Sequence, residues 1–148
     1  LLFVLLHNYG KGREVLIYGI DYNFLFENSD MIDIPLEELA QRVHKTGGFI
    51  AHAHPFRVRG YIDSNAPKCL ELCDGIEVYN AANYDDENKK ATDLNEELKL
   101  TAISGSDSHD SFSEFIGEAG IAVTQRIKNE QQLVDILKKG DYQLIING

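Results

Sequence analysis

The chain has 148 residues, of which 43% are hydrophobic and 26% charged, and this composition suits one globular domain with an apolar core. Its 24 acidic residues outnumber 14 Lys and Arg, which gives a formal net charge of -10, and an acidic surface disfavours general nucleic-acid binding. No apolar run reaches membrane-spanning length, and two cysteines, Cys69 and Cys73, indicate buried thiols in a reducing cytoplasm, not a disulfide framework.

The predicted elements alternate between strands and helices along the chain. Residues 13–20 have the branched and aromatic content of a buried strand, and a helix begins at Pro35 and ends before Gly47. Further strands are predicted at 49–54, 74–80, 100–109, 120–125 and 142–148, and further helices at 67–73, 85–99 and 129–140. This alternation predicts a single α/β domain over residues 1–148, whose parallel sheet is either open or closed into a barrel.

Polar side chains close three successive predicted strands. His52 and His54 end the first of these strands, Asn80 ends the next, and Asp107 and His109 end the third. In parallel α/β folds the working groups gather at the carboxyl ends of the strands. The sequence therefore predicts a polar, metal-capable rim at one edge of the sheet.

His54, Asp107 and His109 of this rim are candidate metal ligands, and His52 is a candidate for a supporting contact to them. Residues i and i+2 of a strand face the same side, so His52 and His54 can share a site, and Pro55 then turns the chain. Asp107 and His109 repeat this spacing, and carboxylate and neutral imidazole are favoured ligands of zinc, iron and manganese. A hydrogen-bonded core histidine is the alternative for both His52 and His54, and a turn aspartate with a surface histidine is the alternative for Asp107 and His109.

Two arginines follow His54 in the same loop. The planar guanidinium fork matches phosphate oxygens, so Arg57 and Arg59 are candidate substrate-binding residues, with an ordinary loop ion pair as the alternative. Glu77 and Asn80, on the strand 74–80, are candidates for a hydrogen bond to a metal-bound histidine, or are structural. Ser106 is a further candidate for such a supporting contact.

Other well-known site motifs are absent from the sequence. It contains no Walker A loop, no G-x-G-x-x-G after a strand, and no G-x-S-x-G elbow, because the stretch "ISGSDSH" lacks the second glycine. The sequence therefore does not support a P-loop protein, a dinucleotide-binding protein or a serine hydrolase.

Three stretches, "GGFIAHAHPFR", "DGIEVYNA" and "ISGSDSH", resemble in order and spacing the C-terminal half of a PHP (polymerase and histidinol phosphatase) domain. The resemblance covers roughly residues 13–125 and is to the small stand-alone bacterial phosphoesterases of this family. It implies a distorted seven-stranded (β/α) barrel with two or three divalent metals, Zn, Fe or Mn, at its rim. It also implies that His54, Asp107 and His109 bind metal and that Arg57 contacts phosphate.

The sequence departs from the family pattern in its N-terminal part. The opening H-x-H motif, the later Asp-His motif and the Glu of the G-x-E motif have no counterpart here, and the Glu position falls near Leu6. The chain opens at Leu1 and its single methionine is Met31. We therefore expect this chain to supply the C-terminal half to two-thirds of the barrel, which an N-terminal segment or a partner chain completes.

The function predicted from the resemblance is hydrolysis of a small phosphorylated metabolite or nucleotide by a metal-activated water. A non-catalytic or degenerate PHP-like module that binds metal or phosphate, or serves assembly, is the alternative. A PHP domain within a larger polymerase is a third reading, which the acidic charge disfavours.

Overall fold

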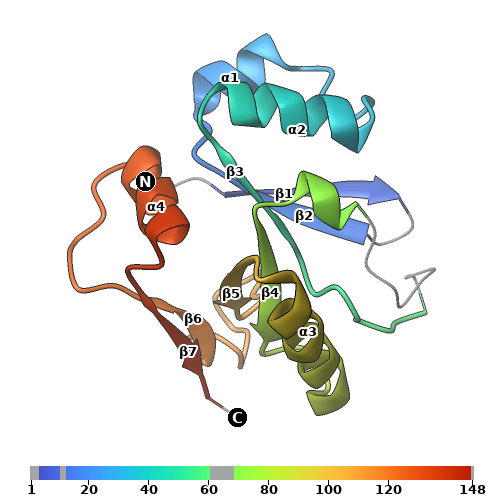
Figure 1. The fold of residues 1–148 in the computed structure, drawn as a ribbon, viewed down its shortest axis with the longest axis vertical. Coiled ribbons are helices and arrows are strands. Elements are labelled where there is room, and N and C mark those ends of the chain that lie inside the picture. The colour runs from blue at the N-terminus through green and yellow to red at the C-terminus, as the bar shows by residue number, and fades with distance from the viewer. Residues whose placement is uncertain (1–3, 11–12, 61–68, 148) are drawn as a thin grey trace.

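The computed structural model describes residues 4–10, 13–60 and 69–147 (Figure 1). The strands are β1 (Val4–Gly10), β2 (Arg13–Tyr18), β3 (Phe49–His52), β4 (Gly75–Asn80), β5 (Thr101–Gly105), β6 (Ala119–Ala122) and β7 (Gln143–Ile146). The helices are α1 (Tyr22–Glu27), α2 (Leu36–Lys45), α3 (Asp85–Leu98) and α4 (Glu130–Lys139), with a 3-10 helix η1 (Leu70–Leu72). The main sheet has five strands in the order β1-β2-β3-β4-β5, and β6 pairs with β7 in a second sheet.

The main sheet is mixed, so the α/β class is confirmed, but the prediction of a parallel sheet throughout is wrong. Strands β3, β4 and β5 are parallel, whereas β1, β2 and β3 pair antiparallel, as do β6 and β7. Tyr18, the last residue of β2, pairs with Phe49, the first residue of β3. The α1–α2 connection therefore begins and ends at the same end of the sheet, and it is not the crossover that a parallel pair requires.

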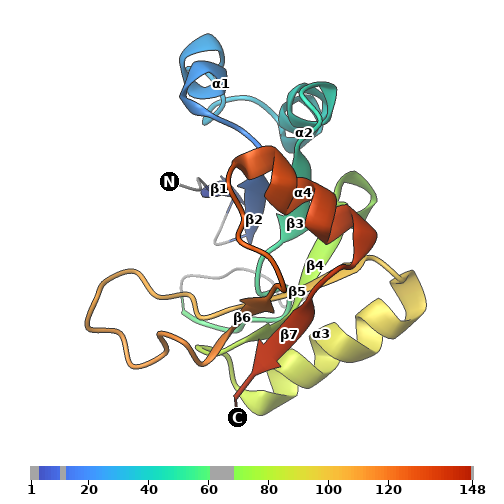
Figure 2. The same cartoon turned by 90° about the vertical axis from the view of Figure 1, so that its left-hand side faces the viewer.

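The strands of the described part of the chain form an open sheet and a separate two-stranded sheet, not a closed barrel. The β6–β7 pair lies beside the outer edge of β5 (Figure 2). There, Ser104 Oγ donates to the carbonyl oxygen of Gly120 at 2.5 Å and accepts from its N–H at 3.2 Å. This contact covers part of an edge that would otherwise offer unpaired backbone groups.

The core lies on both faces of the main sheet. Helices α1 and α2 cover one face, where Ile50 and Cys73 belong to their apolar cluster, and α4 covers the other, where Phe49 and Ala51 contact Leu133. Alternate residues of β3 thus serve the two clusters, which explains why the whole strand is buried. Burial also raises the pKa of the Cys73 thiol to about 12, and neither Cys69 nor Cys73 forms a disulfide.

The helices follow the predicted periodicity. In α2 the buried residues Leu36, Leu39, Ala40 and Val43 recur at helical spacing. The predicted helices 85–99 and 129–140 are confirmed as α3 and α4, and the one predicted at 67–73 is reduced to η1, with residues 67 and 68 outside the described range. Among the described helices, none combines the length and apolarity needed to cross a membrane.

Candidate functional site

The carboxyl ends of β3, β4 and β5 meet around one buried guanidinium. Arg57, which is 6% exposed, follows β3 and donates from Nε to Asn83 Oδ1 at 2.8 Å and from Nη2 to Asn80 Oδ1 at 2.7 Å. Its Nη1 pairs with the carboxylate of Asp107, which follows β5. One side chain therefore connects the three strand ends that the sequence predicted to share a rim.

His54 and Asp107, two of the predicted metal ligands, both have left-handed backbone conformations. Their φ angles are 26° and 53°, a region that residues with a Cβ rarely adopt. The two other described non-glycine residues of this kind, Cys69 and Lys99, cap the ends of helices. His54 and Asp107 cap no helix, and unusual backbone of this kind concentrates at functional sites.

The His54 imidazole faces a carboxylate that the sequence reasoning missed. His54 Nε2 lies 2.9 Å from Glu14 Oε2, and the His54 side chain is 5% exposed. Glu14 stands at the start of β2, where its carbonyl accepts from the Ala53 N–H at 3.0 Å. In a parallel sheet the start of β2 would lie at the opposite edge, so only the antiparallel pairing of β2 with β3 brings Glu14 to the rim.

Glu77 lies beside His54 and also contacts Asn80. Glu77 Oε2 accepts from the His54 N–H at 2.8 Å and from Asn80 Nδ2 at 3.0 Å. Regular alternation would place residues 77 and 80 on opposite faces of β4, but the register shifts between Glu77 and Tyr79 and brings the two side chains together. Burial raises the pKa of the Glu77 carboxyl, and the nearby negative charge of Asp107 adds to this effect.

The remaining histidines of the predicted rim have different surroundings. His52 is 3% exposed, and its Nδ1 lies 2.9 Å from the carbonyl oxygen of Ala53. His109 is exposed, with Nδ1 2.8 Å from the carbonyl oxygen of Asp107, and both residues line an open cavity of about 420 Å³. Ser106 is half-buried between β5 and Asp107.

The Arg59 guanidinium contacts a carboxylate, a backbone carbonyl and an aromatic ring of this chain. Its Nη1 donates to Glu87 Oε1 at 2.9 Å, its Nη2 donates to the carbonyl of Ala82 at 2.9 Å, and its guanidinium stacks 4.5 Å from the ring centre of Tyr84. Glu87, which is 2% exposed, also accepts from the Val58 N–H at 2.6 Å. The Arg59–Glu87 ion pair is the alternative that the sequence left open for Arg59, with a partner that the sequence did not identify. These contacts fasten the loop carrying Arg57 to the first turn of α3.

The donor types at the rim suit a divalent metal, but the described residues do not complete a ligand set. In the part of the chain that the structure describes, no three His, Cys, Asp or Glu side chains gather closely enough to hold an ion. His54 is paired with Glu14, and Arg57 neutralises Asp107. The assignment of His54, Asp107 and His109 as metal ligands stays a prediction.

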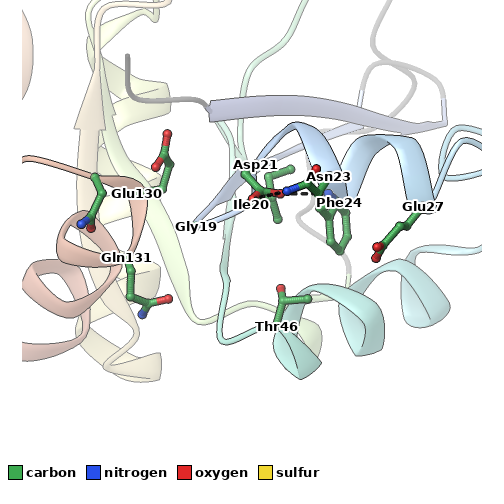
Figure 3. A pocket seen from close by; sticks show the side chains of 10 residues that line it. Gly19, Ile20, Asp21, Asn23, Phe24, Glu27, Thr46, Glu130 and Gln131 are labelled. Carbon is green, nitrogen blue, oxygen red and sulfur yellow. Dashed lines mark hydrogen bonds between the residues drawn. The ribbon is translucent and has the colours of Figure 1, made fainter.

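A second cavity, of about 340 Å³, lies between α1, the end of α2 and the start of α4 (Figure 3). Its lining includes Asp21, whose carboxylate caps α1 by accepting from the Phe24 N–H at 2.9 Å, and the polar side chains of Thr46 and Gln131. None of the predicted site residues lines this cavity. The candidate site is therefore the rim at the ends of β3, β4 and β5.

Comparison with known proteins gives one family match. Residues 85–142 match the model of a family described as PHP-associated. Among solved structures, the chain is similar to a proposed metal-dependent phosphoesterase from Bifidobacterium adolescentis, with 17% identity and a TM-score of 0.44. The alignment covers 70% of this chain and 36% of that one, so the chain spans little more than a third of that protein's length.

Among curated proteins, no relative matches the sequence. The family match extends from α3 to the residue before β7 and includes Asp107 and His109, two of the residues on which the resemblance was founded. This match confirms the recognition made from the sequence for residues 85–142, which are similar to a PHP-associated family.

Proposed function

We propose that this chain is part of a metal-dependent phosphoesterase that hydrolyses a small phosphorylated metabolite or nucleotide. One observation carries the proposal: an imidazole, a buried guanidinium and carboxylates converge at the ends of β3, β4 and β5. Carboxylate and imidazole are metal ligands, and a guanidinium recognises phosphate. The match of residues 85–142 to a PHP-associated family supports the same reading.

Arg57 is the proposed phosphate-binding residue. A guanidinium has five N–H donors, and the contacts to Asn83, Asn80 and Asp107 use one donor on each nitrogen. One N–H on each terminal nitrogen is left for phosphate oxygens. The three protein contacts hold the planar group in one orientation, which reduces the ordering that a bound phosphate would require.

His54, Asp107 and His109 are the proposed metal ligands, and Glu14 is added to them because it faces His54 Nε2. When bound, a divalent metal polarises a phosphoryl oxygen and lowers the pKa of a coordinated water. The remaining ligands, and the strands that would complete a seven-stranded barrel, are proposed to come from an N-terminal segment or a partner chain.

A second function is favoured by the pairs that these side chains form with one another. Asp107 is neutralised by Arg57 and His54 is paired with Glu14, so the site is satisfied without a metal. This arrangement suits a non-catalytic PHP-like module that binds phosphate.

Metal content and hydrolysis distinguish these two functions. Inductively coupled plasma mass spectrometry of this chain together with the N-terminal segment or partner chain that completes the barrel, without added metal, is expected to find bound Zn, Fe or Mn, and this assembly is expected to hydrolyse a panel of small phosphomonoesters. His54→Ala and Asp107→Ala should each lower the metal content and abolish hydrolysis. His44→Ala is the matched control, since the half-exposed His44 pairs with Asp74 away from the rim.

Unchanged metal content in both His54→Ala and Asp107→Ala would overturn the ligand assignment. A chain that binds inorganic phosphate but holds no metal and hydrolyses no ester would favour the non-catalytic module.

A further inference from the structure

Glu77 is a buried carboxylate with contacts to two different loops of the rim. It lies in β4 and is 4% exposed. Its Oε2 accepts from the backbone N–H of His54 at 2.8 Å and from the side-chain amide of Asn80 at 3.0 Å. A single oxygen thus contacts the turn after β3 and the end of β4.

The other carboxylate oxygen of Glu77, Oε1, occupies space that is open only because the neighbouring strand has a glycine there. A Cβ built on Gly105, in β5, would lie 2.5 Å from Glu77 Oε1, which is closer than two such atoms can approach. A side chain at position 105 would therefore displace the carboxylate or the strand. This contact gives a physical reason for the glycine in "ISGSDSH", the stretch that leads to Asp107.

Asn80 extends the contacts of Glu77 to the guanidinium. While its Nδ2 donates to Glu77, its Oδ1 accepts from Arg57 Nη2 at 2.7 Å and from the Ala82 N–H at 2.9 Å. The bond to Glu77 fixes which end of the amide faces Arg57. Arg57 in turn pairs with Asp107, so the hydrogen bonds run without a break from Glu77 to the end of β5.

The His54 contact has a similar effect on the imidazole. His54 has a φ of 26°, and its buried N–H finds its acceptor in Glu77 and not in the sheet. Without that acceptor, the turn would hold an unsatisfied buried donor in a strained conformation. Burying a carboxylate is itself unfavourable, so stability alone does not account for an acid at this position.

We propose that Glu77 is a positioning residue, which holds His54 directly and Arg57 through Asn80 in the arrangement that binds phosphate. This inference rests on the proposed function, since it takes Arg57 as the phosphate-binding group. Glu77 itself is separated from the phosphate by the groups that it positions.

Three substitutions test the proposal by isothermal titration with inorganic phosphate. Glu77→Gln retains an oxygen that can accept both hydrogen bonds and should bind phosphate within about threefold of the wild type. Glu77→Met removes both acceptors, and Gly105→Ala displaces the carboxylate, so each should weaken phosphate binding by about tenfold or more. Glu71→Met, at an exposed acid of η1, is the control and should change nothing.

A second measurement is independent of any ligand. Hydrogen exchange of the Arg57 Nε proton, followed by NMR, reports how firmly the guanidinium is held. We expect slow exchange in the wild type, Glu77→Gln and Glu71→Met, and fast exchange in Glu77→Met and Gly105→Ala. Folding of each variant is checked by near-ultraviolet circular dichroism, and if Glu77→Met does not fold, Gly105→Ala carries the comparison.

The outcomes separate the two claims. Slow exchange of Arg57 and unchanged phosphate affinity in folded Glu77→Met or Gly105→Ala would overturn the positioning role and leave the proposed function standing. A wild type that binds neither phosphate nor metal would overturn the proposed function, while the exchange data would still show whether Glu77 holds Arg57. Equal losses in Glu77→Gln and Glu77→Met would also contradict the proposal, because the hydrogen-bonding oxygen would then not be the group that matters.

Discussion

Two arginines of this chain bind carboxylates in opposite surroundings. Arg42, on α2, reaches Asp30 at 2.7 Å and Glu38 at 2.6 Å, and all three side chains are at least a quarter exposed. Arg57, at the ends of β3–β5, pairs with Asp107, and their side chains are 7% and 16% exposed. The chemical groups are the same, but water can replace the partners of Arg42 and not those of Arg57.

The difference in burial shows which of the two arginine–carboxylate ion pairs is the better indicator of a binding site. An exposed ion pair gains little, because solvent screens it and its side chains lose freedom. A buried pair loses hydration that its attraction seldom recovers, so an apolar pair of equal size would often be as stable. The Arg42 cluster is therefore an ordinary surface contact, whereas the burial of Arg57 supports the proposal that it recognises an anion.

Arg57→Met should have the largest effect, because it leaves the mostly buried Asp107 without its cation. We expect a loss of about 3–5 kcal/mol in the free energy of unfolding, measured with urea, together with loss of phosphate binding. The double variant Arg57→Met/Asp107→Leu should recover most of the stability and none of the phosphate affinity. A double variant as unstable as the single one would contradict the account of the buried pair.

Leu39→Ala should destabilise the fold without disturbing the rim. Leu39 is fully buried in the cluster between α2 and the main sheet, so its truncation should lower the unfolding free energy by about 2–5 kcal/mol. The folded fraction should bind phosphate like the wild type in calorimetry. A changed affinity would mean that the α2 layer and the rim are coupled.

Glu77→Gln should change how stability depends on pH. Burial raises the pKa of Glu77 in the folded state above its ordinary value of 4.5, so its contribution is most favourable below that value and is lost as the pH rises through the folded pKa. Gln does not titrate. Urea unfolding between pH 4 and pH 8 should therefore show the stability of Glu77→Gln, relative to the wild type, increasing with pH. A difference that does not vary with pH would contradict the raised pKa.

Arg42→Gln should have the smallest effect. The Arg42 guanidinium holds the pKa of Asp30 below its ordinary value through a hydrogen bond, but both groups face solvent. The urea midpoint should be almost unchanged at neutral pH, and any difference should vanish at high salt. A loss comparable to that of Arg57→Met would remove the contrast between the two arginines.

Much of the site could be predicted from the sequence because its residues follow strands that are parallel. Asn80 ends β4, and His54 and Asp107 lie two residues beyond the ends of β3 and β5. The parallel pairing of these strands places their ends at one edge. Glu14 was missed because it lies at the start of a strand. The residues around Glu14 in the sequence do not indicate that β2 runs antiparallel to β3. The contact between Glu77 and Asn80 depends on a register shift in β4, which regular alternation does not predict.

The sequence by itself determined the local elements and the chemistry of the strand ends. Apolar spacing specifies α2 and α4, and Pro55 favours the turn between β3 and Arg57, because both effects act over a few neighbouring residues. Only the tertiary structure decided that β2 runs antiparallel to β3 and that Glu14 contacts His54. It also decided that Glu77 accepts hydrogen bonds from both His54 and Asn80. Strand direction and register are set by pairing between distant segments, so these contacts exist only once the sheet has formed.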